Sequence, residues 1–423
     1  MHRIETIFSR ITQNSILSIL LIFLLSILIV PIFNRVIPES LRPSIPRDYI
    51  NFYAPVAQNL LDGNGLLNSV GNPAVRYPPG YPLILAGWVI LAGWLGISTQ
   101  AAVYNLSIIC FSLTCVIIYW ISKQIWSPGL AMIPALLWLT YPFALWLAQQ
   151  PSIEMPFLVF LLSGFGLWWE ATTRPQTNKT YYFIGGIFIG LSMLVRPIAL
   201  FVGVILGGLI FVGRSKESIR SRLVLLFIFL GGILIPVLPW EIWAYYQTGE
   251  VILLSTNGPT SIMDGLTFAV NSTEFRETFH IPGKIEIVMT DLNVQRFRLD
   301  SFPAILKAVW VEIQHQPVGL VQLIILKALR GWYATDSGRG EIQTLIIQVP
   351  YLFLLILSFF FCWKAKTTRF LALTVGLLIL YFWGMTTLVL SILRYMSLVF
   401  AFGFLLAPGL YLFLWDKVVK TRQ

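Results

Sequence analysis

The chain has 423 residues, of which 57% are hydrophobic and only 11% are charged, and its mean hydropathy is +0.77. Soluble domains use about 25% charged residues, so this composition excludes an ordinary soluble protein and predicts an integral membrane protein. The net charge of +10 does not indicate a nucleic-acid partner, because the lysines and arginines are spread over short segments between apolar runs.

Apolar runs of about 20 residues, the length that crosses a bilayer as a helix, recur along the chain. The first run is too long for the apolar region of a signal peptide and no A-x-A-like site follows it, so we expect an uncleaved first span. The sequence predicts an all-α polytopic bundle of about 10 to 11 transmembrane helices. One run, 81–98, is borderline. The others lie near 14–33, 101–121, 128–147, 153–169, 181–195, 197–213, 223–243, 343–363, 370–390 and 393–415.

Basic segments between the runs set the expected orientation. If 81–98 crossed the membrane and the N-terminus were cytoplasmic, the basic segments 172–179 and 214–222 would lie outside, against the positive-inside rule. Treating 81–98 as a juxtamembrane or partly inserted helix moves these segments inside. Two large extracytoplasmic segments then remain, 34–100 and 244–342.

The second extracytoplasmic segment carries predicted elements of its own. GEVILLSTNGPTSIMDG, residues 249–265, is typical of extended structure broken by turns. Residues 301–332 have apolar residues at helical spacing with interspersed charge, which predicts two helices that are split at Pro317 and lie along the bilayer surface. No repeat or low-complexity linker divides the sequence, so we expect residues 1–423 to form a single membrane domain onto which both segments fold.

Few patterns in the sequence can support catalysis. The chain has only three histidines and lacks HExxH, Cys-pair and DxD patterns, so the sequence predicts no metal site. Its three cysteines lie inside apolar runs and indicate packing rather than a disulfide framework. Phosphate-binding loops of the P-loop or Rossmann type and a GxSxG nucleophile are also missing from the sequence. Carboxylates and arginines at the outer membrane face remain as the candidate functional groups.

Asp48 follows the first span and precedes apolar residues at helical spacing. One interpretation is a general base, because a carboxylate at the mouth of an apolar cavity can take the proton of an attacking hydroxyl. The other is a helix N-cap, a position at which Asp is preferred. Pro55 would kink a helix that begins at Asp48, which weakens the cap interpretation. The two roles are compatible.

Glu154, in QQPSIEMPF, lies at the outer start of a predicted span. A structural interpretation places it in the first helical turn, with Ser152 as the cap and the positive end of the helix dipole nearby. In a functional interpretation it binds an acceptor hydroxyl or assists the base. The sequence leaves both open.

Arginines interrupt apolar stretches at Arg196 in SMLVRPIALF and at Arg394 in LSILRYMSLVF. In the expected topology both lie at the outer ends of spans, where snorkelling to the interface is the structural explanation. The functional explanation is binding of a lipid-linked phosphate, for which the planar guanidinium is suited. Arg76, beside Tyr77, also has two interpretations, as a phosphate ligand or as part of a structural turn.

The order of these residues resembles that of GT-C fold membrane glycosyltransferases. An Asp shortly after the first span is followed by Y-x-x-x-A-x-x-L-x-x-G, beginning at Tyr53 and ending at Gly63, and then by RYPPGYPLILA, as in the first external loop of that fold. Further matches are the Glu of PSIEMPF, GLSMLVRP, LPW followed by STNGPTSIMDG, and the final ILRY. Within the fold, the likeness is to the protein mannosyltransferase and aminoarabinose transferase (ArnT-like) group, and it covers most of the chain.

The resemblance implies a GT-C-like bundle with two large extracytoplasmic loop regions. It implies an inverting sugar transfer from a polyprenyl-phosphate donor held in membrane lipid, without a cofactor or catalytic metal. The acceptor would be a hydroxyl or amine of a glycan, lipid or protein at the extracytoplasmic face of the plasma (inner) membrane. Residue by residue, Asp48 matches the catalytic base and Glu154 the acid of the second external loop. The residues that match donor phosphate or lipid contacts are Arg196, Arg394, Arg76 and Tyr77.

One motif departs from the group. Relatives often read PW-x-x-RN before the long external loop, whereas this chain reads PWEIWAYY, with Trp243 and Ala244 in place of Arg and Asn. No role of that pair carries over, and the resemblance assigns none to Glu241.

Two other classes of function compete with a transferase. A bundle of about ten spans would equally permit a transporter or lipid flippase, but transport sites usually lie near the bilayer midplane, with broken helices and buried ionisable groups. The candidate groups here lie at span ends. A non-catalytic polytopic assembly partner is the third class, and it would make Asp48 and both arginines dispensable.

Overall fold

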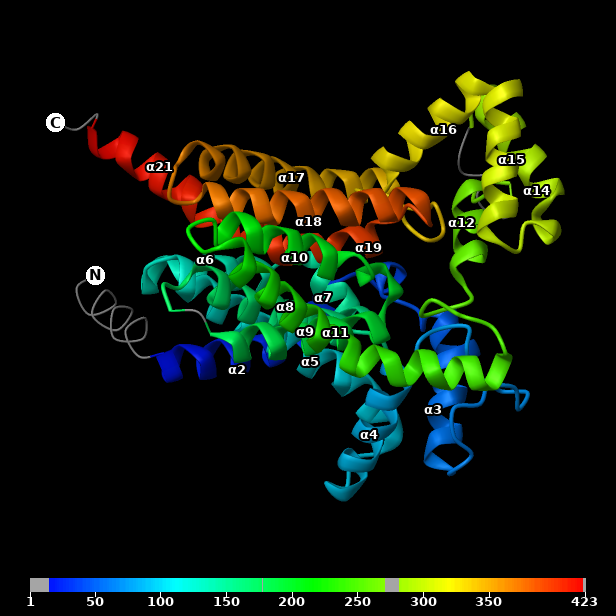
Figure 1. Cartoon of the computed structure of the whole chain (residues 1–423), viewed down its shortest axis with the longest axis horizontal. Helices are drawn as coiled ribbons and strands as arrows, with labels where there is room; N and C mark the ends of the chain where they lie inside the picture. The colour runs from blue at the N-terminus through cyan, green and yellow to red at the C-terminus, as the bar shows by residue number, and fades with distance from the viewer. Residues whose placement is uncertain (1–14, 177, 271–280, 421–423) are drawn as a thin grey trace. The chain divides into compact units, whose positions relative to one another are not determined.

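The structure is a computed structural model that describes residues 15–176, 178–270 and 281–420 (Figure 1). Within these ranges most of the chain is helical, and the only β-type pairing is an isolated antiparallel bridge between Leu67 and Pro73. The all-α fold class is therefore confirmed. Residues 271–280 of the predicted external segment 244–342 lie outside the described residues.

Contacts divide the chain into two compact units. The first comprises Met1–Ser255, Ser358–Val375 and Ala401–Gln423, and the second comprises Thr256–Leu357 and Gly376–Phe400. Along the sequence, α17 (Glu341–Lys364) and α18 (Arg369–Leu388) run from one unit into the other. That residues 1–423 act as a single membrane domain stays a prediction.

The first unit holds most of the long helices. In chain order its elements up to residue 255 are α2 (Ser15–Val36), η1 (Glu39–Leu41), η2 (Tyr49–Tyr53), α3 (Ala54–Leu61), α4 (Gly80–Trp94), α5 (Thr99–Ile125), α6 (Pro128–Leu139), α7 (Pro142–Ala148), α8 (Glu154–Thr173), α9 (Lys179–Val195), η3 (Pro197–Ala199), α10 (Val202–Gly213) and α11 (Ile219–Thr248). It ends with α20 (Phe400–Gly403), which begins in the second unit, η6 (Phe404–Leu406) and α21 (Ala407–Lys420).

Small residues let α9 approach its neighbours closely. A Cβ added at Gly186 of α9 would collide with the Phe229 carbonyl of α11, and one added at Gly232 of α11 would collide with the Phe183 carbonyl of α9. Gly164 of α8 faces α9 in the same way. Helices in membranes associate through such close backbone contacts, because lipid tails are as apolar as the side chains that they would replace. The glycines therefore fix α9 between α8 and α11.

The number of spans depends on how short helices are counted. By length and composition, seven helices of the described chain can cross a membrane, or up to eight if α6 and α7, which are bent by 61° at their break, form one span. The predicted spans at 181–195 and 197–213 are apolar helices shorter than this length, as is Gly80–Trp94. The chain is thus a multi-pass membrane protein, and the count of 10 to 11 stays a prediction.

The second unit is built around a separate apolar core. Its elements are α12 (Gly258–Leu266), α14 (Gly283–Val294), η4 (Arg296–Arg298), α15 (Phe302–His315), α16 (Pro317–Arg330), most of α17, the end of α18, α19 (Leu393–Met396) and η5 (Ser397–Val399). Core residues that pack together include Met263, Val288, Ile305 and Leu323, one from each of α12, α14, α15 and α16. Figure 1 shows these four helices in yellow-green and yellow.

Two expectations for this unit have different outcomes. The split at Pro317 is confirmed, because α15 ends at His315 and α16 begins at Pro317. The extended structure predicted for 249–265 is wrong over its second half, where residues 258–266 form α12. Pro259 lies at the start of that helix, a position that needs no N–H donor, so the proline starts a helix rather than making a turn.

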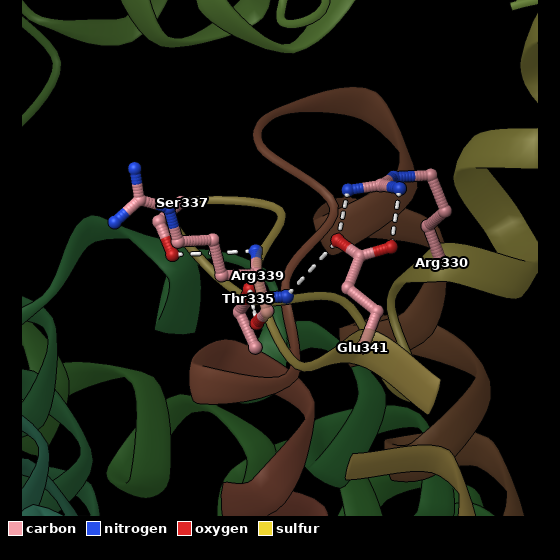
Figure 2. A network of polar contacts seen from close by, with 5 residues as sticks. All are labelled: Arg330, Thr335, Ser337, Arg339 and Glu341. Atoms are coloured by element: carbon pink, nitrogen blue, oxygen red, sulfur yellow. Dashed lines mark hydrogen bonds and ion pairs between the residues drawn. The ribbon is translucent and has the colours of Figure 1, made fainter. Parts of the chain in front are cut away.

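A buried ion pair closes the loop between α16 and α17 (Figure 2). Arg330 and Glu341 form a bidentate pair, with nitrogen–oxygen distances of 2.7 and 2.6 Å, and the Thr335 N–H donates to the same carboxylate at 3.3 Å. The Arg330 guanidinium also lies 4.6 Å from the ring centre of Phe268. Such planar two-point pairing is geometrically specific, so the pair sets the start of α17 against the end of α16.

Candidate functional site

Asp48 lies at the start of a helix that contains a π-helical turn. The π-helical segment η2 leads directly into α3, and the Ala54 N–H donates to the carbonyl of Tyr49. Pro55 has no N–H and cannot join a regular helical ladder, and the wider turn before it accommodates this interruption. The kink expected at Pro55 therefore takes the form of a π-helical turn.

The side chain of Asp48 does not cap this helix. Instead, the Tyr77 hydroxyl lies 3.4 Å from Asp48 Oδ1 and donates to it. The cap interpretation is wrong because a residue 29 positions later takes the carboxylate. Two residues that the sequence singled out separately, Asp48 and Tyr77, are thus brought together.

Aromatic rings surround Tyr77. Its ring centre lies 5.0 Å from that of Phe52 and 5.4 Å from that of Tyr53, and Tyr53 in turn contacts Tyr81 edge-on at 5.1 Å. The Arg76 guanidinium lies 5.4 Å from the Tyr77 ring centre, within the range of cation–π attraction. The segment RYPPGYP therefore supplies one aromatic wall of the site.

Glycine is required where this wall meets α9. A Cβ added at Gly80 would come within 2.6 Å of the Leu194 carbonyl oxygen, so only glycine lets the start of α4 lie against the end of α9. The close approach brings the RYPPG segment next to the residues that precede Arg196. The sequence motif and the arginine are thereby placed at one end of the unit.

Glu154 and Arg196 form a buried ion pair. Glu154 is fully buried and Arg196 is 6% exposed, and the Arg196 Nη1 to Glu154 Oε1 distance is 3.1 Å. Arg196 has an extended backbone in the break between α9 and η3, as expected for a residue before proline. The snorkelling interpretation is therefore wrong, because the side chain turns inward to a carboxylate.

Ser152 also serves Glu154 rather than the helix. Its hydroxyl donates to Glu154 Oε2 at 3.0 Å, and its N–H donates to the Ser107 hydroxyl at 3.2 Å. No side chain caps α8, so the cap predicted at Ser152 is wrong. Both carboxylate oxygens of Glu154 have a donor, which is what a buried carboxylate requires.

Tyr53 joins the two halves of the cluster. Burial raises its pKa well above the usual value, and the charges of Tyr77, Asp48 and Glu154 add to this rise while that of Arg196 opposes it. Both pairs are therefore near enough to act on one buried phenol. Sequence reasoning placed Tyr53 only in a motif, although its position five residues after Asp48 was the available signal. We call Asp48, Tyr53, Tyr77, Glu154 and Arg196 the Tyr53 cluster.

Arg394 belongs to the second unit, on α19. The N–H of the preceding Leu393 donates to the Ala334 carbonyl at 2.8 Å, and the Ser397 hydroxyl donates to the Arg394 carbonyl at 3.0 Å. These bonds hold the short helix against the loop that the Arg330–Glu341 pair closes. A role of Arg394 in the same site stays a prediction.

The Tyr53 cluster combines a proton acceptor with a cation. Asp48 is a half-buried carboxylate that one phenol orients, and Arg196 is a guanidinium suited to phosphate oxygens. Among the described residues, no three His, Cys, Asp or Glu side chains gather in a way that could hold a metal ion. The cluster can therefore serve acid–base chemistry on a substrate that carries negative charge.

Comparisons with known proteins bear on this arrangement. Residues 77–243 match the family described as dolichyl-phosphate-mannose-protein mannosyltransferase, a range that includes Tyr77, Glu154 and Arg196. The search of curated proteins finds no match.

Solved structures match over almost the whole chain. The oligosaccharyltransferase of Archaeoglobus fulgidus tethered to an acceptor peptide matches 96% of this chain and 50% of its own, with 14% identity and a TM-score of 0.57. The oligosaccharyltransferase AglB from Archaeoglobus fulgidus, with an inhibitory peptide and dolichol-phosphate, matches 96% of this chain and 51% of its own at 12% identity, with a TM-score of 0.53. ArnT from Cupriavidus metallidurans bound to undecaprenyl phosphate matches 94% and 76% at 10% identity, with a TM-score of 0.42.

The chain spans about half the length of the oligosaccharyltransferase that it matches. At these identities the structural likeness establishes the fold, and the family match adds a sequence relationship over residues 77–243. The resemblance drawn from the sequence is confirmed at this level: the chain has the GT-C glycosyltransferase fold, and residues 77–243 match the protein mannosyltransferase family model.

Proposed function

We propose that the chain transfers a sugar from a polyprenyl-phosphate donor to an acceptor hydroxyl or amine at the extracytoplasmic face of the plasma (inner) membrane. The observation that carries the proposal is the Tyr53 cluster, in which the Tyr77 hydroxyl holds the Asp48 carboxylate and Glu154 holds the buried Arg196. Three of its members lie in the range that matches the mannosyltransferase family. Two oligosaccharyltransferase structures from Archaeoglobus fulgidus share the fold, one with an acceptor peptide and one with dolichol-phosphate, which supports a lipid-linked donor.

The reaction is a single displacement at the anomeric carbon. Asp48 takes the proton of the acceptor O–H or N–H while the acceptor atom bonds to that carbon. The bond from the same carbon to the phosphate oxygen breaks, and polyprenyl phosphate leaves with the electron pair. Attack opposite the leaving group inverts the anomeric configuration. The Tyr77 hydroxyl orients the Asp48 carboxylate during this step.

Positive charge is needed where the phosphate leaves. Arg196 supplies it, because a guanidinium has five N–H donors and can bind phosphate while it is paired with a carboxylate. Glu154 and Ser152 fix its position through the bonds described above. Arg76, over Tyr77, and Arg394, from the second unit, are further proposed contacts to the donor phosphate.

The test is release of polyprenyl phosphate by purified protein from a panel of polyprenyl-phosphate sugars. We expect Asp48→Asn to reduce release by on the order of 10²- to 10⁴-fold, the usual contribution of a general base. Asp62→Asn is the matched control, because it makes the same change at an exposed carboxylate of the predicted external segment 34–100. The hydrogen bond described for the Asp62 side chain comes from Gln58, outside the Tyr53 cluster.

The outcomes separate the classes of function. Release by wild type that is lost in a folded Asp48→Asn variant supports the transferase and its base. Release that survives the substitution leaves a transferase but removes Asp48 from the role of base. No release from a widened donor panel contradicts the transferase and favours a transporter or flippase, which transport of the same lipids in vesicles would then measure.

A further inference from the structure

Shortly after α11 ends at Thr248, one residue has a strained, left-handed backbone conformation. Leu254 has a φ of 63°, and among the described residues it is the only non-glycine residue with a positive φ. Its side chain is fully buried. A left-handed conformation is unfavourable for an L-residue with a branched side chain and persists only where the surroundings hold it. The residues around Leu254 should therefore show what holds it.

Two neighbouring side chains of α11 hold both polar backbone groups of Leu254. The Leu254 N–H donates to Glu241 Oε1 at 2.8 Å, and the Trp240 indole N–H donates to the Leu254 carbonyl at 3.0 Å. One of these bonds involves a charged acceptor, which makes it stronger than a bond between neutral groups. We call residues 250–255 the strap, and α11 is hydrogen-bonded to it at Leu254.

The next residue of the strap reaches the candidate site. The Ser255 hydroxyl donates to the Arg76 carbonyl at 2.6 Å. The Arg76 guanidinium lies over Tyr77, and the Tyr77 hydroxyl donates to Asp48. An unbroken series of contacts therefore runs from Glu241 and Trp240 on α11 to the proposed base.

We infer that Glu241 and Trp240 are positioning residues, which hold the Leu254–Ser255 part of the strap so that Ser255 fixes Arg76 and Tyr77 beside Asp48. The inference rests on the proposed function. Neither residue touches the Tyr53 cluster through a bond described above, so neither is a catalytic residue. Glu241 takes this role in a motif where the resemblance to other transferases assigns none.

The contrary view is that Glu241 merely stabilises the end of α11. The two views differ in what Ser255 does. If the strap acts through Ser255, loss of the Glu241 bond to Leu254 and loss of the Ser255 bond to Arg76 interrupt the same series of contacts. Their effects on catalysis are then not additive. If Glu241 acts only on the stability of the helix end, Ser255→Ala leaves catalysis unchanged or adds an independent effect.

The experiment measures kcat/KM for the donor with Glu241→Ala, Ser255→Ala and the double variant. We expect each single variant to lose on the order of 10- to 100-fold, because small misplacements of site residues cost this much, and the double variant to lose no more than the larger single effect. Glu241→Gln and Ser255→Thr keep an acceptor and a hydroxyl at these positions, and both should restore most of the activity. Glu250→Ala, an exposed acid in the strap, is the control and should match wild type.

Hydrogen exchange of the strap provides a readout besides activity. Backbone amides of residues 250–256 should exchange faster in Glu241→Ala and in Trp240→Phe, and at the wild-type rate in Glu241→Gln and Glu250→Ala. Trp240→Phe keeps the aromatic ring but removes the N–H donor, so it decides the question if Glu241→Ala does not fold. Its expected kcat/KM loss is of the same order as that of Ser255→Ala.

Several results would overturn the inference. Wild-type kcat/KM in Ser255→Ala, or a double variant whose loss is the product of the single losses, would show that the strap does not act through Ser255. Faster hydrogen exchange of the strap with unchanged kcat/KM would show that the bonds of Glu241 and Trp240 to Leu254 have a structural role only. If wild type itself releases no polyprenyl phosphate, the proposed function fails first, and this inference fails with it.

Discussion

At the scale of single residues, substitutions in the buried pair of Glu154 and Arg196 should affect stability and catalysis differently. Removing one partner of a buried pair strands the other charge and typically costs about 3–5 kcal/mol, whereas replacing both by apolar residues is often neutral. We therefore expect Glu154→Ala to lower the unfolding midpoint in detergent well below that of the double variant Glu154→Leu with Arg196→Met. The double variant should fold but release no polyprenyl phosphate, because it lacks the proposed phosphate contact.

An ion pair with one exposed partner is the control for that comparison. Arg174 is 63% exposed and pairs with Glu170, which is 9% exposed and lies one turn away. Arg174→Ala should lower the unfolding midpoint less than Glu154→Ala does, because the charge that it removes is exposed to solvent. A Glu154→Leu, Arg196→Met protein that keeps wild-type turnover would remove Arg196 from the phosphate site.

The residues of the site were predictable from the sequence, but their partners were not. Asp48, Glu154 and Arg196 drew notice because charged groups at span ends need an explanation. The interpretation of Asp48 and Ser152 as caps used the commonest local role of their residue types. Asp48 instead accepts a hydrogen bond from Tyr77, 29 positions away. Ser152 donates to Glu154, which pairs with Arg196, 42 positions further along the chain. Such contacts depend on the packing of α4, α8 and α9, which no local pattern contains.

At the scale of elements, α15 and α16 turn opposite faces to the core and to the outside. Ile305 and Leu323 lie in the apolar core of the second unit, whereas Leu306 and Trp310 are 69% and 60% exposed. Neither helix is among the candidate spans. An amphipathic helix that is not a span and exposes large apolar residues is expected to lie in the membrane interface. We predict that the outer face of α15 contacts lipid.

Cysteine labelling in lipid nanodiscs measures this contact. We expect Leu306→Cys and Trp310→Cys to react more slowly with a water-soluble maleimide than Lys307→Cys, an exposed position on the same helix. Background should be low, because the native cysteines, Cys110, Cys115 and Cys362, are buried. Equal rates at all three introduced cysteines would contradict the lipid contact.

Element prediction succeeded where proline falls between two helical patterns and failed where it begins one. The break at Pro317 lies between two amphipathic runs, so the pattern on either side identifies the helices. Pro259 follows Asn257 and Gly258, a combination that also marks turns, and the helix after it is too short for a clear apolar period. The predicted spans at 181–195 and 197–213 were read as full crossings from apolar composition alone, although Pro197 limits their length.

At the scale of the whole molecule, the orientation of α11 in the membrane determines on which side the site lies. Its 30 residues extend for about 45 Å at 1.5 Å per residue, more than the roughly 30 Å of bilayer hydrocarbon. The basic segment 214–222 lies at its start, and the strap, bonded to Arg76 through Ser255, lies just past its end. If the basic segment is cytoplasmic, as the positive-inside rule predicts, the Tyr53 cluster must face the other side.

A pair of cysteines at the two ends of α11 tests this orientation. We expect Glu250→Cys to react with a membrane-impermeant maleimide in intact cells, and Lys216→Cys to react only after the membrane is opened, because both positions are exposed and one span separates them. Labelling of both in detergent is the control for reactivity. Reaction of Lys216→Cys alone in intact cells would reverse the chain and place the proposed transfer on the cytoplasmic face. Reaction of both in intact cells would mean that α11 does not cross the bilayer, and the argument that links the basic segment to the site would then fail.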